Sequence, residues 1–212
     1  MAEDDKEASA KLNSIEGLLS TEIVAVADDM IASCTRWASA VAVEKGAPVL
    51  AEIVSSYFKD LATGPPQPMW GDLAFRLTPS VAPEASSNRA VIRITTIPGE
   101  HHPLQTRTAF LTVGFLTSGW PCVPVLPGSL PEIIAVVSSA EMQELIDTEV
   151  KGLVSTSLFE PEPGKVVTVT HYTSMDTVAG SDKVSKAYAP VKHLFAGTPE
   201  SLQGEVRWSR IS

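Results

Sequence analysis

Gly64-Pro65-Pro66-Gln67-Pro68 divides this sequence into two unlike parts. A proline lacks the backbone N–H and has a fixed φ, so three prolines this close together interrupt both helices and central strands. Before this breaker, apolar residues recur at helical spacing, and after it they alternate with polar residues. We therefore predict two domains: a helical N-terminal segment at residues 1–64 and an antiparallel β-sandwich domain at residues 69–212.

The first part carries an apolar stripe with steps of three and four residues, which predicts a long amphipathic helix. Lys45-Gly46 is a typical helix end, and Pro48 suits the first turn of a second helix. Residues 1–11 are charged and small, and we expect them to fray. The stripe consists of Leu12, Ile15, Leu19, Ile23, Val26, Met30, Cys34, Trp37 and Val41.

From Met69 onward the apolar period changes from about 3.6 to 2, as in half-buried strands. One short helix is predicted at 138–148, with Ser139 as its cap. No long helices separate the strands, so parallel crossovers are excluded. The predicted fold class is α+β, mainly β: N-terminal helices followed by an antiparallel, jelly-roll-like β-sandwich without an internal repeat. The alternating segments are 75–78, 92–95, 111–115, 166–172 and 206–209.

Charge and cysteine usage exclude some classes of protein. The 212 residues carry a formal charge of −9, with a pI near 4.9, which argues against a free-standing nucleic-acid binder. Cys34 and Cys122 fall in different parts without C-x-x-C spacing, so we expect reduced, buried thiols. No apolar run approaches the roughly 18 residues of a membrane span, so no membrane partner is predicted.

Histidines offer the main alternative to a non-catalytic protein. His101 and His102 lie in a Pro- and Gly-flanked loop, whereas His171 and His193 lie within predicted strands. We interpret these as solvated or ordinary sheet histidines, and predict no metal, no cofactor, no catalytic residue and no enzyme. The alternative is a hydrolase or isomerase whose site is not marked by a sequence motif and uses His101, His102 or His171.

Arginines at polar positions of three predicted strands suggest a binding face. Arg76, Arg93 and Arg207 each alternate with apolar neighbours, so their side chains would share one face of the sheets. A normal solvent-exposed face explains these arginines as well; otherwise such a face would meet RNA or an acidic neighbouring subunit.

The end of the chain carries a family resemblance. Residues 186–195 read as a strand, 196–203 as a polar loop and 204–211 as a final strand, while a strand at 108–117 precedes the helix at 138–148. This order resembles single jelly-roll coat proteins of small plus-strand RNA plant viruses, such as the bromovirus and tymovirus groups. The acidic start departs from the basic arm that many such coat proteins carry.

The resemblance implies a structural role. A coat protein would self-assemble as a homo-oligomer into a viral capsid enclosing RNA, in the virion and the host cytoplasm, without catalysis. A second hypothesis is a partner-binding module that uses the N-terminal helices, because their apolar stripes exceed what a short appendage needs for itself.

Overall fold

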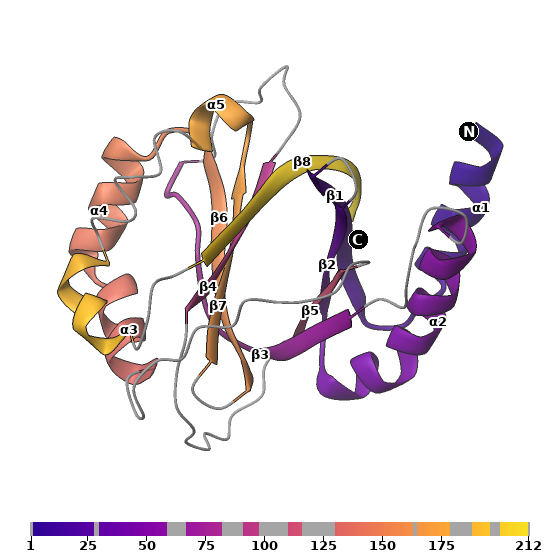
Figure 1. Cartoon of the computed structure of the whole chain (residues 1–212), viewed down its shortest axis with the longest axis horizontal. Coiled ribbons are helices and arrows are strands. Elements are labelled where there is room, and N and C mark those ends of the chain that lie inside the picture. Colours follow the sequence, from indigo (N-terminus) through magenta and orange to yellow (C-terminus); the bar gives the residue numbers. More distant parts are fainter. Residues whose placement is uncertain are drawn as a thin grey trace. The chain divides into compact units, whose positions relative to one another are not determined.

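The computed structural model describes residues 2–27, 30–58, 67–81, 91–97, 110–115, 130–162, 165–178, 188–195 and 200–211 (Figure 1). Contacts divide the chain into two compact units. The first unit comprises Met1–Asp72, Thr106–Gly119 and Arg207–Ser212, and the second comprises Leu73–Gln105 and Trp120–Val206. The elements in chain order are α1 (Ala2–Asn13), β1 (Leu18–Ala27), β2 (Met30–Trp37), α2 (Ala40–Phe58), β3 (Gln67–Leu77), β4 (Val91–Ile97), β5 (Phe110–Phe115), α3 (Leu130–Val137), α4 (Ala140–Glu149), β6 (Leu153–Glu162), β7 (Lys165–Tyr172), α5 (Met175–Val178), the 3₁₀-helix η2 (Ala189–Leu194) and β8 (Glu200–Ile211).

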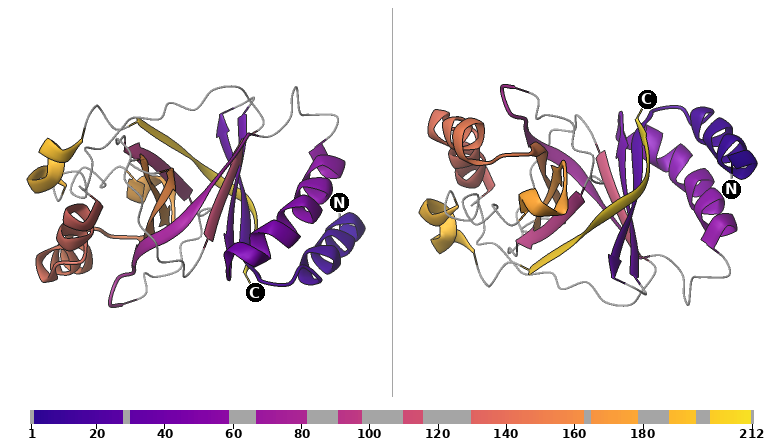
Figure 2. Two further views of the ribbon diagram at one scale, coloured as in Figure 1. Left: turned by 90° about the horizontal axis from the view of Figure 1, so that it is seen from below. Right: turned by 90° about the horizontal axis from the view of Figure 1, so that it is seen from above.

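The first unit packs two helices against an antiparallel sheet. Strand β1 pairs with β2, β2 with β5, and β5 with the first half of β3. Helices α1 and α2 lie next to each other beside the β1–β2 hairpin (Figure 2). Their shared core contains the fully buried Trp37 ring. The core residues are Leu12, Ile15, Leu18, Trp37, Leu50 and Ile53.

The predicted long helix across residues 12–41 is wrong, because most of it is a β-hairpin. Gly17 takes φ +77°, a left-handed conformation that ends helical structure before β1. Both faces of the hairpin contribute buried residues, such as Thr21 at 2% and Val24 at 1% exposed. A strand buried on both faces loses strict alternation, so its apolar spacing imitates a helix.

Helical structure is correct at both ends of that segment but with different limits. Residues expected to fray form α1, and α2 begins at Ala40, so Pro48 lies inside it rather than in its first turn. None of the helices in the described part of the chain is both long and apolar enough to cross a membrane.

The second unit also packs helices against an antiparallel sheet. Strand β6 pairs with β7, β7 with β4, and β4 with the first half of β8. Figures 1 and 2 show α3 and α4 covering one face of these strands. The core residues are Leu77, Ile133, Val137, Met142, Ile146, Val150, Leu153, Leu158, Val166, Tyr172, Val178, Val191 and Leu194.

Several local predictions are confirmed across the two units. The Ser139 hydroxyl accepts a hydrogen bond from the Met142 N–H at 3.1 Å and caps α4. Strands lie where the period-2 patterns predict them, at 75–77, 92–94, 111–115, 166–172 and 206–209. The predicted strand at 186–195 is wrong: Pro190 stands in the first turn of η2, where its fixed φ fits a 3₁₀-helix.

The predicted β-sandwich is wrong, although antiparallel pairing is confirmed. A jelly roll packs one sheet against another, whereas each core in this chain is built from helices and a sheet. The fold is therefore α+β with helices in both units. The breaker that set the predicted domain boundary at 64–69 begins in residues 59–66, which lie outside the described residues, so that boundary stays a prediction.

The two units contain the same hairpin, which corrects the expectation of no internal repeat. Gly17-Leu18-Leu19-Ser20-Thr21 matches Gly152-Leu153-Val154-Ser155-Thr156. Thr21 meets Thr35, and Thr156 meets Thr170, each through hydroxyls 2.9 Å apart and 14 residues apart in sequence. The carbonyls of Gly17 and Gly152 each accept a 2.8 Å bond from the residue after the hairpin. The shared register identifies a structural repeat.

Replacing Gly152 with alanine is expected to destabilise the protein by about 1–3 kcal/mol. Gly152 has φ +72°, and an added Cβ would lie 2.7 Å from Thr173 Oγ1 and 2.8 Å from Thr177 Cβ. Urea unfolding followed by circular dichroism measures the change. Lys151→Ala at the adjacent exposed position is the control, and equal stability of the two variants would contradict the role of this turn.

Candidate binding cavity in the second unit

A small apolar cavity lies in the second unit, between helices and sheet. It has about 290 Å³ of empty space, part of it open to solvent, of which about 10 Å³ admits the centre of a water-sized molecule. That inner space holds about one water molecule. Its walls come from β3, α3, α4, β6 and the residue before η2. The lining residues are Phe75, Leu77, Val137, Met142, Ile146, Thr156, Leu158 and Tyr188.

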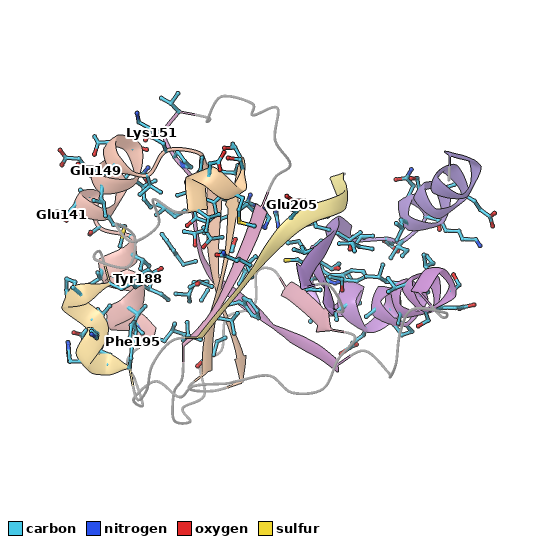
Figure 3. All side chains as sticks on the ribbon, turned by 45° about the horizontal axis from the view of Figure 1, so that its top comes forward. Glu141, Glu149, Lys151, Tyr188, Phe195 and Glu205 are labelled. Carbon is cyan, nitrogen blue, oxygen red and sulfur yellow. The ribbon has the colours of Figure 1, made fainter. Side chains whose placement is uncertain are left out.

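Local structure fixes the helical wall of the cavity. Met142 and Ile146 are spaced four residues apart on α4, so both side chains face the sheet. The Ser139 cap sets where α4 begins and thus which residues face inward. Exposed residues on the opposite side of this region, Glu141, Glu149 and Lys151, are labelled in Figure 3.

Two polar groups belong to this lining. The Thr156 hydroxyl is already engaged with Thr170 Oγ1. The Tyr188 phenol is the other, and Tyr188 and Phe195 flank η2 and pack against the core (Figure 3). Desolvation by burial, aided by the nearby Tyr172, raises the pKa of Tyr188 to about 12. At neutral pH the phenol therefore keeps its proton and can donate a hydrogen bond.

The raised pKa of Tyr188 predicts a specific loss of stability in alkali. The folded-state pKa lies above the ordinary value of 10, so the folded protein holds this proton more tightly than the unfolded chain does. The stability that the Tyr188 proton contributes is fully present below pH 10 and is lost as the pH rises through about 12. We expect wild type to lose more stability than Tyr188→Phe between pH 10 and pH 12, measured by urea unfolding at each pH. If the free energy of unfolding fell equally with pH in the two proteins, the raised pKa of Tyr188 would be contradicted.

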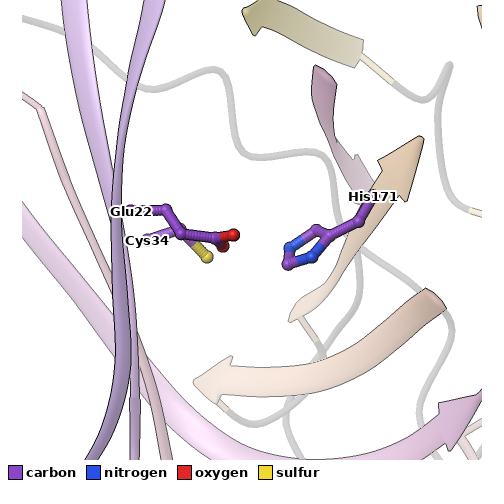
Figure 4. A group of neighbouring side chains, drawn as sticks. All are labelled: Glu22, Cys34 and His171. Atoms are coloured by element: carbon purple, nitrogen blue, oxygen red, sulfur yellow. The ribbon is translucent and has the colours of Figure 1, made fainter. Parts of the chain in front are cut away.

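A second pair of ionisable side chains lies in the first unit. Glu22 and Cys34 are register partners on β1 and β2, and their side chains lie side by side (Figure 4). Burial, followed by the adjacent Glu22 carboxylate, raises the pKa of the Cys34 thiol, so Cys34 stays a protonated, unreactive thiol. This confirms the expected buried free thiol at Cys34; Cys122 lies outside the described residues.

The described residues do not test the predicted arginine face. Arg76 is exposed on β3, and Arg93 lies on β4 opposite Thr170. Arg207 belongs to the part of β8 assigned to the first unit. A common face of Arg76, Arg93 and Arg207 stays a prediction. The expected self-association, the expected localisation and the expected absence of cofactors also stay predictions.

The predicted histidine alternative gains no support from the described residues. His193 is exposed in η2, with its Nε2 at 3.8 Å from Glu132 Oε1, a surface pair of little energetic weight. His171 is half-buried on β7 (Figure 4). His101 and His102 lie outside the described residues.

The cavity could not be identified from the amino-acid sequence. Its lining is apolar apart from Thr156 and Tyr188, and apolar side chains at helix or strand spacing predict a core equally well. The available signal was the Ser139 cap together with Met142 and Ile146, which placed the helical wall.

Comparisons with known proteins place the fold. No protein-family model and no curated protein matches the chain. Among solved structures, an anthrone oxidase-like protein matches with a TM-score of 0.56 and 14% identity over 99% of this chain and 87% of that one.

Two further solved structures agree with this match. A proposed monooxygenase from Fusobacterium nucleatum subsp. nucleatum has a TM-score of 0.55 and 11% identity over 99% of this chain and 88% of the other. One from Lactobacillus acidophilus NCFM has a TM-score of 0.51 and 10% identity over 100% and 91%.

These neighbours overturn the coat-protein resemblance and the capsid function drawn from it. The chain shares its fold over nearly its whole length with an anthrone oxidase-like protein and two proposed monooxygenases. The predictions of a jelly-roll coat protein and a viral capsid subunit are therefore wrong, and the hydrolase alternative gains no support. The names of the neighbours also run against the prediction of a non-enzyme, although identities of 10–14% establish the fold alone.

Proposed function

We propose that this chain is an oxygenase that oxidises a small, uncharged aromatic molecule held in the cavity of the second unit. The observation that carries the proposal is the apolar lining with a single protonated phenol, Tyr188. Apolar walls favour aromatic rings by removing their surface from water, and one donor orients them. The name of one structural neighbour, an anthrone oxidase-like protein, suggests dioxygen chemistry on an aromatic ketone such as anthrone.

Tyr188 would act by hydrogen bonding to the oxygen of the substrate. Its phenol would donate to the ketone oxygen. This contact strengthens as solvent takes a proton from the methylene on the opposite side of the central ring and negative charge spreads through the conjugated rings to that oxygen. Anthrone and dioxygen would give anthraquinone and water. The methylene carbon loses four electrons and dioxygen gains four, one oxygen atom becoming the new carbonyl and the other leaving as water.

Turnover of anthrone in air tests the proposal. We expect protein-dependent formation of anthraquinone, measured by liquid chromatography against the spontaneous oxidation in buffer. Tyr188→Phe keeps the ring but loses the donor, so kcat/KM should fall about tenfold. Tyr172→Phe is the matched control, because Tyr172 does not line the cavity. Product formation no faster than in buffer would reject the proposed function.

A further inference from the structure

A hydrogen-bond network joins the end of β3 to α4. The Asp147 carboxylate accepts two bonds from Ser80: one from the N–H to Oδ1 at 2.8 Å and one from the hydroxyl to Oδ2 at 2.6 Å. Gln143 Nε2 donates to the Thr78 carbonyl at 3.2 Å and to Asp147 Oδ1 at 3.0 Å. It also lies 3.4 Å from Ser80 Oγ. The network thus fastens residues 78–80 to one helix.

The two elements joined by this network are two walls of the cavity. Leu77, the last residue of β3, lines the cavity and directly precedes Thr78. Met142 and Ile146 line it from α4, each adjacent in sequence to one network member, Gln143 or Asp147. Moving Asp147 away from Ser80 would therefore move the apolar walls apart.

The size of the cavity makes such movement necessary. Its inner space of about 10 Å³ holds about one water molecule, so an aromatic ring enters only if the walls separate. The network itself is exposed, so water can replace its bonds when they break. Hydrogen bonds from Ser80 hold the pKa of Asp147 below its ordinary value, so the carboxylate is ionised at neutral pH and accepts both bonds.

We infer that Ser80, Gln143 and Asp147 form a latch whose opening admits uncharged aromatic ligands to the cavity. The inference rests on the proposed function for the location of the site. A ligand binds only the open state, so its apparent affinity is reduced by the fraction of molecules that are open. Weakening the latch raises that fraction.

Binding of naphthalene, followed by NMR of ¹³C-methyl methionine, tests the latch in the full chain. The Met142 methyl reports on the cavity, and Met175, which is 40% exposed on α5, is the internal reference. We expect Asp147→Ala to bind naphthalene about fivefold more tightly than wild type. Asp147→Asn, which keeps one acceptor oxygen, should lie between the two.

Two control variants separate the latch from general loosening. Glu144→Ala removes an exposed carboxylate from the same helix, and Ser138→Ala removes the 3.3 Å bond to the Ala135 carbonyl at the end of α3. Both should bind naphthalene as wild type does. Equal affinities of Asp147→Ala and Glu144→Ala would overturn the latch, as would tighter binding in Ser138→Ala. Anthrone turnover is measured in a separate experiment. The latch can therefore be contradicted while the oxygenase proposal stands, and the oxygenase proposal can be contradicted while the latch stands.

Discussion

Replacement of Trp37 by alanine is expected to lower the free energy of unfolding by about 3–5 kcal/mol. The ring is 0% exposed and fills the centre of the first unit's core. Helix α2 approaches it so closely that a Cβ on Gly46 would lie 2.7 Å from Trp37 Cη2. The surrounding backbone is thus built around the ring, and alanine leaves a cavity that cannot close fully. Urea unfolding monitored by far-ultraviolet circular dichroism gives the value.

Trp37→Phe distinguishes the contribution of the buried ring to stability from the cost of its buried N–H donor. Trp37 Nε1 is buried and has no hydrogen-bond partner among the described residues. An unpartnered buried donor costs about 1–3 kcal/mol, so its removal offsets part of the lost ring area. The phenylalanine variant should therefore lose less than half as much stability as the alanine variant. A loss in Trp37→Ala below about 1 kcal/mol would show that this ring does not organise the core.

Filling the cavity from α3 should abolish turnover. Val137 is 3% exposed and lines the cavity, so Val137→Phe places a ring in the space that the substrate needs. We expect kcat/KM for anthrone to fall at least about a hundredfold, since the volume lost exceeds what the closed cavity offers. The measurement is initial rate of quinone formation at substrate concentrations below KM.

Val136→Phe is the control for this substitution. Val136 precedes Val137 on α3 and packs partly buried against the same core, but it does not line the cavity. Both variants should retain cooperative thermal unfolding, because overpacking costs about 1–3 kcal/mol. Comparable turnover in the two variants would place the substrate elsewhere.

Local signals in the sequence were reliable where one face of an element is exposed. The Ser139 cap and the spacing of Met142 and Ile146 predict α4 correctly, since capping and amphipathic spacing are local physics. The strand containing Val166 and Tyr172 is buried on both faces, and it was predicted instead from its β-branched composition.

Tertiary burial defeated the same signals at the β1–β2 hairpin. Its spacing matched a helical stripe because residues on both faces are buried, including Thr21 and Val24. The sequence does carry a signal for this hairpin, in the repeated Gly-Leu-x-Ser-Thr segments that begin at Gly17 and Gly152. In the structure a left-handed glycine precedes each hairpin. Comparing the two segments would have identified the hairpin from the sequence.

The cavity was beyond sequence reasoning for a different reason. Leu77, Ile146 and Tyr188 come from distant parts of the chain and carry no catalytic motif. A site built from apolar side chains differs from a core mainly in an unfilled gap, which is a property of the packed structure. The latch could not be predicted from the sequence either, since Ser80 and Asp147 are 67 residues apart.

Oxidation of anthrone under ¹⁸O-labelled dioxygen tests whether the cavity of the second unit is an oxygenase site. The proposed chemistry predicts anthraquinone carrying one ¹⁸O atom, formed in proportion to the wild-type protein and to Val136→Phe, with the second labelled atom in water. Mass spectrometry of the quinone reads the label, and protein-free samples set the background. Labelled product that does not increase with protein concentration, or that Val137→Phe forms as fast as wild type, would contradict an oxygenase site in this cavity.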